Sequence, residues 1–126
     1  RFLRAKAAEF RLNTEKITII GSSAGGHLAA LVGVTNGHKV LEGRIGDHLE
    51  QSSRVDAIVS FYGASNLQSI LAQSTEFGLT VRIPALKLLL GDLPEKKSEL
   101  AKLASPVAHL DKSDPPLLLI QPGYRS

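Results

Sequence analysis

The fold is decided by the stretch Ile17-Thr18-Ile19-Ile20-Gly21-Ser22-Ser23-Ala24-Gly25-Gly26. Its first four residues are mostly β-branched and are stopped by Gly21, which predicts a short buried strand. The residues from His27 to Val34 are mostly small or apolar, which predicts a helix that is packed on most of its faces. A strand, a glycine turn and a helix in this order are typical of an α/β fold.

The segment Gly21-Ser22-Ser23-Ala24-Gly25 matches the pattern G-x-S-x-G and lies between the predicted strand and the predicted helix, as in a nucleophile elbow. In such a turn the central serine is held at an unfavourable backbone angle, so that its hydroxyl stands clear of the sheet. The strand and the helix approach closely, and this requires small residues, which the sequence supplies at Gly21, Ala24, Gly25 and Gly26. We therefore predict that Ser23 is a nucleophile and that the Ala24 N–H, at the positive end of the helix dipole, binds an oxyanion.

Two other interpretations of this turn fit less well. A phosphate-binding glycine turn would follow G-x-G-x-x-G or end in G-K-[ST], and neither pattern is present. Ser22 also carries a hydroxyl, but the residues two positions away from it are Ile20 and Ala24 instead of glycines. Ser23 is therefore the predicted reactive serine.

The rest of the chain continues the alternation of helices and strands. Gly33 or the Asn36-Gly37 turn is expected to close the helix after the elbow. The segment His38–Ser53 is polar and predicts a surface loop. The remaining predicted strands are Val55–Tyr62 and Leu117–Ile120, and the remaining predicted helices are Phe2–Leu12, Leu67–Ala72, Pro84–Leu90 and Glu95–Ala104. The strand Val55–Tyr62 is almost continuously apolar, as in a parallel sheet that is covered on both faces.

Composition excludes several classes of protein. The chain has 126 residues, of which 43% are apolar, and this suits one folded domain. The longest apolar runs are far shorter than the roughly 20 residues of a membrane span. The net charge of +3 is contributed by the first 16 residues, which hold five basic and two acidic side chains. The remainder is balanced and only 5% of all residues are aromatic, so we expect no nucleic-acid partner.

The sequence predicts no metal and no cofactor. It contains no cysteine, which excludes disulfides, thiolate catalysis and cysteine-type zinc sites. His38 and His48 lie near Asp47 and Glu50, but no H-E-x-x-H pattern and no pair of histidines four residues apart is present. These four side chains are therefore interpreted as solvated loop residues.

The segment Lys16–Ala30 resembles α/β-hydrolase esterases and lipases of the acetyl-esterase, hormone-sensitive-lipase-like and feruloyl-esterase-like groups. Further segments resemble the same families, namely Arg1–Leu12, Phe61–Leu67, Ala104–Val107 and Asp114–Ile120. The resemblance implies an α/β-hydrolase fold with a mostly parallel sheet flanked by helices. It also implies a small-molecule ester substrate, and it makes His27 a structural partner of the elbow.

The chain also departs from these families. They carry H-G-x-x-D after the strand that corresponds to Leu117–Ile120, with the triad acid in or just beyond that loop and the histidine later, whereas this sequence continues as Gln121–Ser126. The upstream H-G-G loop is not present either. The chain opens on Arg1 without Met or an apolar signal region, so we expect residues 1–126 to be the central part of a single domain. His109 comes before the third strand, where a surface or capping role is expected.

The primary hypothesis is a serine hydrolase of carboxylic esters that uses Ser23 and the Ala24 N–H, with Gly21, Gly25, Gly26 and His27 supporting the elbow. One alternative is a truncated hydrolase-like fragment without catalysis. Another is a peptidase of the prolyl-oligopeptidase type, whose elbow is similar. The oligomeric state stays open, and cytoplasmic and secreted locations are both compatible with the sequence.

Overall fold

The structure is a computed structural model that describes residues 1–121. The chain forms two compact units. The first, here called the sheet unit, is Arg1–Gly63 together with the segment from Asp111 onward. The second, the helical unit, is Ala64–Leu110.

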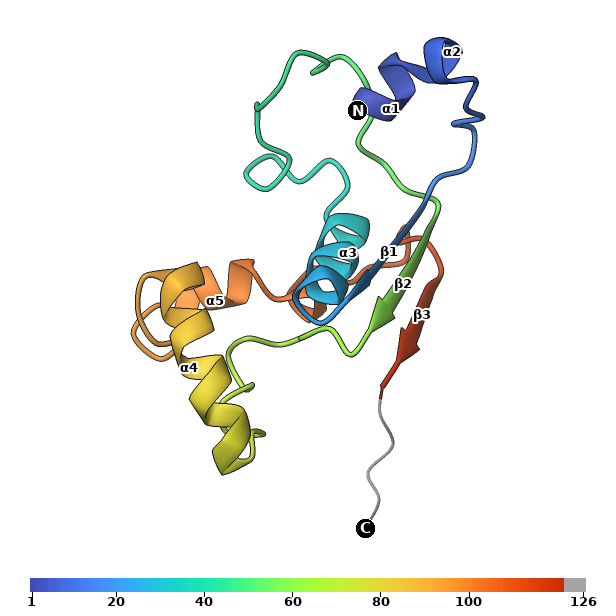
Figure 1. Cartoon of the computed structure of the whole chain (residues 1–126). Helices are drawn as coiled ribbons and strands as arrows, with labels where there is room; N and C mark the ends of the chain where they lie inside the picture. The colour runs from blue at the N-terminus through green and yellow to red at the C-terminus, as the bar shows by residue number, and fades with distance from the viewer. Residues whose placement is uncertain (122–126) are drawn as a thin grey trace. The chain divides into compact units, whose positions relative to one another are not determined.

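The sheet unit is built on three parallel strands in the order β1-β2-β3 (Figure 1). They are β1 (Thr18–Ser22), β2 (Ala57–Phe61) and β3 (Leu117–Ile120). The three predicted strands and the α/β class are confirmed, because parallel neighbours must be joined by crossover segments. The predicted bounds of two strands were wrong. The ladder of β1 with β2 continues through Gly21 to the pair Ser22 and Phe61, and β2 spans Ala57–Phe61 instead of Val55–Tyr62.

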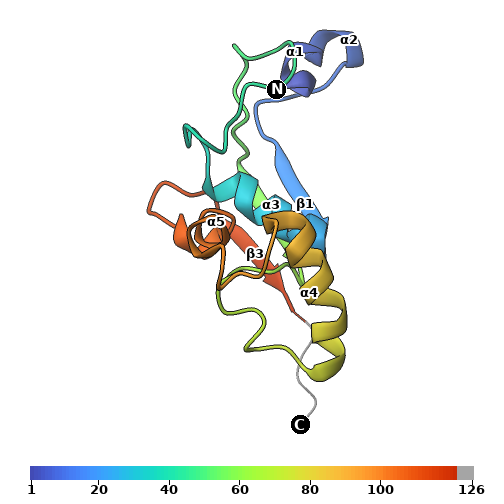
Figure 2. The same ribbon diagram turned by 90° about the vertical axis from the view of Figure 1, so that its left-hand side faces the viewer.

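Helix α3 (Ala24–Val34) packs against β1 and β2 (Figure 2). A Cβ at Gly33 would lie 2.1 Å from Cδ1 of Ile58, so this glycine lets the helix lie close to the sheet. Of the two expected ends of the helix, Gly33 was wrong, because it is buried inside the helix. The helix ends at Val34 and is followed by a turn that contains Asn36 and Gly37, as the other alternative predicted. The helix begins at Ala24, three residues before the predicted start at His27.

The two faces of the sheet differ. Ile58 and its neighbours in the core, Ala29 and Val34, fill the face that α3 covers. Ile20 and Leu118 alternate onto the opposite face and are 64% and 55% exposed. Within residues 1–121 the sheet is thus covered on one face, whereas the apolar pattern of the strands predicted cover on both.

The N-terminal segment forms two short helices, α1 (Phe2–Ala5) and α2 (Ala7–Phe10), where the sequence predicted one. The helix breaks at Lys6, whose φ of −100° and ψ of 11° lie outside the regular helical values. Arg11 then ends α2 with a left-handed φ of 53°. The rings of Phe2 and Phe10 lie 6.0 Å apart and so connect the two short helices.

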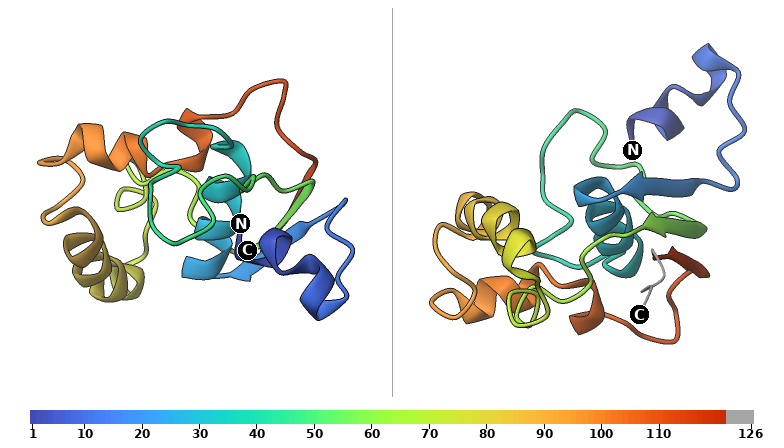
Figure 3. Two further views of the ribbon diagram at one scale, coloured as in Figure 1. Left: turned by 90° about the horizontal axis from the view of Figure 1, so that it is seen from above. Right: turned by 60° about the horizontal axis from the view of Figure 1, so that its bottom comes forward.

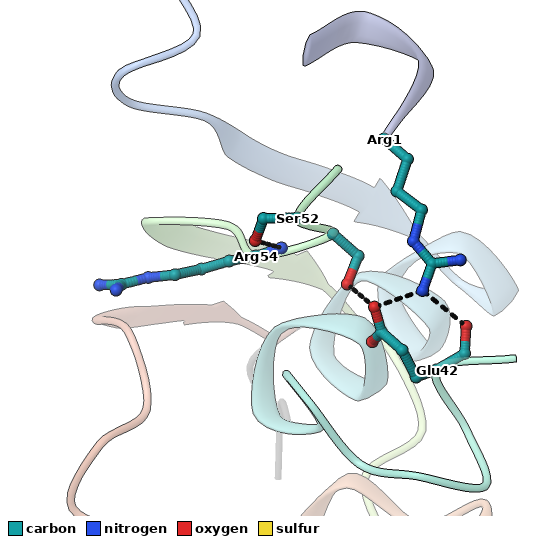
Figure 4. Close-up of polar contacts among 5 residues, drawn as sticks. Arg1, Glu42, Ser52 and Arg54 are labelled. Carbon is teal, nitrogen blue, oxygen red and sulfur yellow. Dashed lines mark hydrogen bonds and ion pairs between the residues drawn. The ribbon is translucent and has the colours of Figure 1, made fainter. Parts of the chain in front are cut away.

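The predicted loop His38–Ser53 contains neither helix nor strand, as expected, and side chains attach it to the N-terminal segment. The Glu42 carboxylate accepts a hydrogen bond from the Arg1 guanidinium at 2.6 Å (Figure 4). It also accepts a hydrogen bond from the Ser53 hydroxyl. The Ser53 hydrogen bond, followed by Arg1, holds the pKa of Glu42 below its usual range against the opposing effect of partial burial. The side chain of Arg1, the residue before α1, thus attaches the middle of this long loop to the N-terminal segment.

The helical unit contains α4 (Glu76–Leu90), α5 (Ser98–Leu103) and a 3₁₀ turn at Pro106–Ala108, with α4 in yellow and α5 in orange in Figure 3. Its core consists of apolar side chains from these helices and from the segment before them, namely Leu67, Leu86, Leu90 and Ala101. None of the helices in residues 1–121 combines the length and the apolar character needed to cross a membrane.

Three helix predictions in this unit need correction. The segment 67–72 forms turns instead of a helix. Helix α4 begins at Glu76, eight residues before the predicted start at Pro84, because the Thr75 hydroxyl caps it by accepting the Gly78 N–H at 3.1 Å. Pro84 therefore lies inside the helix. The predicted helix Glu95–Ala104 is shorter and spans Ser98–Leu103.

Candidate active site

Ser23 lies at the junction of β1 and α3, where the elbow was predicted. Its φ of 52° and ψ of −121° fall outside the regions that L-residues ordinarily occupy. Backbone hydrogen bonds hold it on both sides, because its N–H donates to the Phe61 carbonyl at 2.9 Å and its carbonyl accepts the His27 N–H at 3.0 Å. The strained conformation is therefore imposed by the strand ladder and the helix together.

Close backbone contacts explain how the turn is made. A Cβ at Gly21 would lie 2.1 Å from the Gly25 carbonyl oxygen, and a Cβ at Gly26 would lie 2.7 Å from the Phe61 carbonyl oxygen. Atoms at these distances overlap, and backbone cannot move aside cheaply. Gly21 and Gly26 are thus required by space, as the sequence predicted.

Gly25 differs from these two glycines. A Cβ at Gly25 would meet no atom within 4 Å among the described residues, and its φ is not positive. It is the carbonyl of Gly25, and not its Cα, that lies against Gly21. The expectation that Gly25 must be small for reasons of space was therefore wrong.

The groups that would carry chemistry are exposed at this turn. Ser23 and Ala24 are both exposed, and the Ser23 side chain makes no capping hydrogen bond to the helix. Ala24 is the first residue of α3, where backbone N–H groups lack partners within the helix. Within residues 1–121 no acceptor is bonded to its N–H. A hydroxyl and an unpaired N–H thus lie on adjacent residues at the positive end of a helix dipole.

His27 lies one turn into α3 and is 7% exposed. This burial favours the structural role that the resemblance implies for it. His109 belongs to the helical unit, where its Nε2 is 2.7 Å from the Leu103 carbonyl oxygen at the end of α5, which agrees with the expected capping role. In the part of the chain that the structure describes, no three His, Asp or Glu side chains are grouped closely enough to hold a metal ion.

Sequence reasoning missed two residues beside the elbow. Ser60, 1% exposed on β2, donates its hydroxyl to the Gly26 carbonyl at 3.0 Å and so joins the central strand to the first turn of α3. Gly63 follows β2, and a Cβ there would lie 2.4 Å from the Gly26 carbonyl carbon. Ser60 lies within an almost continuously apolar strand, and Gly63 is one of 11 glycines, so neither residue carries a local sequence signal for these contacts.

Comparison with known proteins gives a consistent result. The profile of the family described as BD-FAE matches residues 1–123. None of the curated proteins matches the chain. Among solved structures, the chain is similar to a bifunctional GH43-CE of Bacteroides eggerthii, with 36% identity and a TM-score of 0.81 over 94% of this chain and 16% of that one.

Two further solved structures are similar. A truncated carbohydrate esterase from gut microbiota has 32% identity and a TM-score of 0.83, over 95% of this chain and 45% of that one. An esterase of Thermogutta terrifontis, described as thermophilic and bound to propionate, has 29% identity and a TM-score of 0.61, over 94% of this chain and 38% of that one. The chain thus spans less than half the length of each of these three proteins.

Proposed function

The chain belongs to the BD-FAE family and has part of an α/β-hydrolase fold, and on this basis we propose that it supplies the nucleophile of a serine hydrolase of carboxylic esters. One observation carries the proposal: Ser23 is held at a positive φ between β1 and α3 with an exposed side chain, and the N–H of the next residue has no acceptor within residues 1–121. Strain of this kind persists where it positions a reacting group.

In the proposed reaction, Ser23 Oγ attacks the ester carbonyl carbon while its proton passes to a general base. The electron pair of the carbonyl bond moves to its oxygen, and the Ala24 N–H donates a hydrogen bond to the resulting oxyanion. The intermediate then expels the alcohol and leaves Ser23 acylated. Attack of water on this acyl-enzyme releases the acid and restores the hydroxyl.

We place the general base and the acid that orients it in parts of the enzyme outside residues 1–126. His27 is buried beneath the turn, which argues against its use as the base. The esterases that the chain resembles are more than twice its length. Residues 1–126 are accordingly proposed as the central part of one hydrolase domain.

The substrate that we propose is a short acyl ester, with acylated carbohydrate as the natural class. One similar protein is described as a carbohydrate esterase, and another was solved with propionate bound. Both descriptions favour ester cleavage over peptide cleavage, and the bound propionate favours short acyl groups over the long chains that define a lipase.

The test compares two adjacent serines in the full-length protein. Ser23→Ala should lower kcat for 4-nitrophenyl butyrate by at least about 1,000-fold, because no other group can form the acyl-enzyme. Ser22→Ala is the matched control, since Ser22 is also exposed but ends β1 with an ordinary backbone angle. Its kcat for the same ester should fall by less than about tenfold. Equal losses from the two substitutions would overturn the assignment of Ser23.

A further inference from the structure

Tyr62 follows β2 with a φ of 41°. Of the described residues other than glycine, it shares a positive φ with Arg11 and Ser23. The left-handed region disfavours any residue with a Cβ, and a bulky aromatic side chain there is a genuine outlier. Tyr62 therefore stands in a conformation that glycine or asparagine would adopt more easily.

Two contacts of the backbone impose this conformation. The Tyr62 N–H donates to the Ile120 carbonyl at 2.7 Å, which continues the ladder of β2 with β3 by one residue. The next residue is Gly63, where a Cβ would lie 2.5 Å from the backbone nitrogen of His27 and 2.6 Å from Oγ of Ser60. The chain bends sharply where it passes the first turn of α3, and the positive φ of Tyr62 makes this bend.

The ladder also places Tyr62 beside Ser23. Ser22 is paired with Phe61, and the Ser23 N–H donates to the Phe61 carbonyl. Ser23 and Tyr62 are the residues that follow this pair on adjacent parallel strands, which are spaced about 4.8 Å apart. Both lie at the carboxyl edge of the sheet, where open α/β folds bind their ligands.

The Tyr62 side chain is only half-buried in the part of the chain that the structure describes. It is 53% exposed, and within residues 1–121 its hydroxyl makes no hydrogen bond. The bend at this position does not require an aromatic ring, because glycine would adopt the same φ without strain, and strained residues of this kind cluster at functional positions.

We propose that Tyr62 is a substrate-contacting residue, whose ring packs against the ester bound at Ser23 and sets the preference for its apolar substituent. This rests on the function proposed above. The ring supplies the contact and the hydroxyl is not required. The interaction forms equally with bound ester and with the transition state, so it acts on KM more than on kcat.

The first experiment measures kinetics in the full-length protein with two series of 4-nitrophenyl and alkyl esters, one varied in the acyl group and one in the alcohol. Tyr62→Ala should lower kcat/KM by about tenfold for the larger esters, mainly through KM, and less for the smallest, as expected for loss of one ring contact. Tyr62→Phe should stay within about twofold of the wild type. A loss that is the same for every ester, or no loss at all, would overturn the proposal, as would a Phe variant as poor as the Ala variant.

The second experiment separates a contact with substrate from a structural role. Tyr62→Gly relieves the strained φ, so its Tm should be equal to or higher than that of the wild type, while kcat/KM falls as it does for Tyr62→Ala. Arg11→Gly is the matched control, because Arg11 has a comparable φ of 53° at the end of α2. The Arg11→Gly variant should have a Tm at least equal to that of the wild type and an unchanged kcat/KM. A clear drop in Tm for Tyr62→Gly would mean that the ring stabilises the fold, and the proposal would fail.

The two proposals fail separately. If Ser23→Ala remains active, the hydrolase assignment is wrong regardless of Tyr62. If Ser23→Ala is inactive while every Tyr62 variant behaves as wild type, the hydrolase assignment stands and only the role of Tyr62 is rejected.

Discussion

The elbow and the loop His38–Ser53 belong to the same unit but are held in different ways. At the elbow, backbone lies against backbone, and a single added Cβ at Gly21 would overlap the Gly25 carbonyl. In the loop, side chains make the attachments, and the best placed of them joins Glu42 to Arg1 at 2.6 Å. The elbow therefore depends on glycine positions that leave no Cβ between strand and helix, and the loop depends on charged side chains that pair.

This difference has an energetic consequence. Overlap between backbone atoms can be relieved only by moving a strand or a helix, which costs on the order of several kcal/mol. Ion pairs at the surface contribute about 0–1 kcal/mol and are screened by salt. The side chains of Arg1 and Glu42 are 17% and 27% exposed, so their pair belongs near the upper end of that range. The elbow should therefore be much less tolerant of substitution than the loop.

The largest effect is expected from Gly21→Ala in the full-length protein. Its Cβ would lie 2.1 Å from the Gly25 carbonyl oxygen, so the free energy of unfolding should fall by about 3 kcal/mol or more. Activity should also be lost, because the same displacement moves Ser23. Urea unfolding and ester hydrolysis measure the two effects.

Gly25→Ala provides the matched control within the same turn. A Cβ at Gly25 meets nothing within 4 Å among the described residues, and alanine favours the helix over glycine. Its free energy of unfolding should lie within about 1 kcal/mol of the wild type or above it. If Gly21→Ala and Gly25→Ala destabilise equally, close packing of the backbone is not what holds the elbow.

A smaller effect is expected in the loop from Glu42→Gln, at about 0.5–1 kcal/mol at pH 7. The folded state lowers the pKa of Glu42, so this stabilisation is complete above the ordinary glutamate pKa of about 4.3 and is lost as the pH falls through the folded-state value. The difference between wild type and Glu42→Gln should therefore shrink in acid and in high salt. Urea unfolding across pH 3–7, a range spanning about 4.3, measures it.

Glu9→Gln is the control for the loop. Glu9 forms a 2.9 Å ion pair with Lys6, but the two side chains are 58% and 40% exposed. No measurable change in stability is expected at any pH. A Glu42→Gln effect as large as that of Gly21→Ala would abolish the distinction between the two regions.

The same contrast explains what could be predicted from the sequence. The elbow is local, since the strand, the glycines and the helix all lie within residues 17–34. The order of strand, turn and helix was predicted there, although the ends of the strand and the helix at the turn were not. The strand Leu117–Ile120 was also predicted with its observed bounds, because a short apolar run after two prolines has few other interpretations. Short-range sequence patterns thus predicted where the strands of the sheet lie in the chain.

The features that the sequence did not reveal depend on distant partners. The Arg1–Glu42 contact joins residues 41 positions apart, and the bend at Tyr62 arises from Ile120 and from the first turn of α3. The signal for the start of α4 is local, since Thr75 caps the helix directly before Glu76, but Pro84 inside the helix also matches the pattern of a first-turn proline and gave the wrong predicted start. Proline at a first turn and proline within a helix cannot be separated by composition alone.

The central claim is that Ser23 is the nucleophile, and covalent labelling tests it most directly. The full-length protein is treated with a fluorophosphonate probe, digested and analysed by mass spectrometry, with Ser23→Ala and Ser22→Ala treated in parallel. The account predicts one modified residue, Ser23, in the wild type and in Ser22→Ala, and no modification in Ser23→Ala. Labelling of Ser22, or labelling that persists in Ser23→Ala, would contradict it.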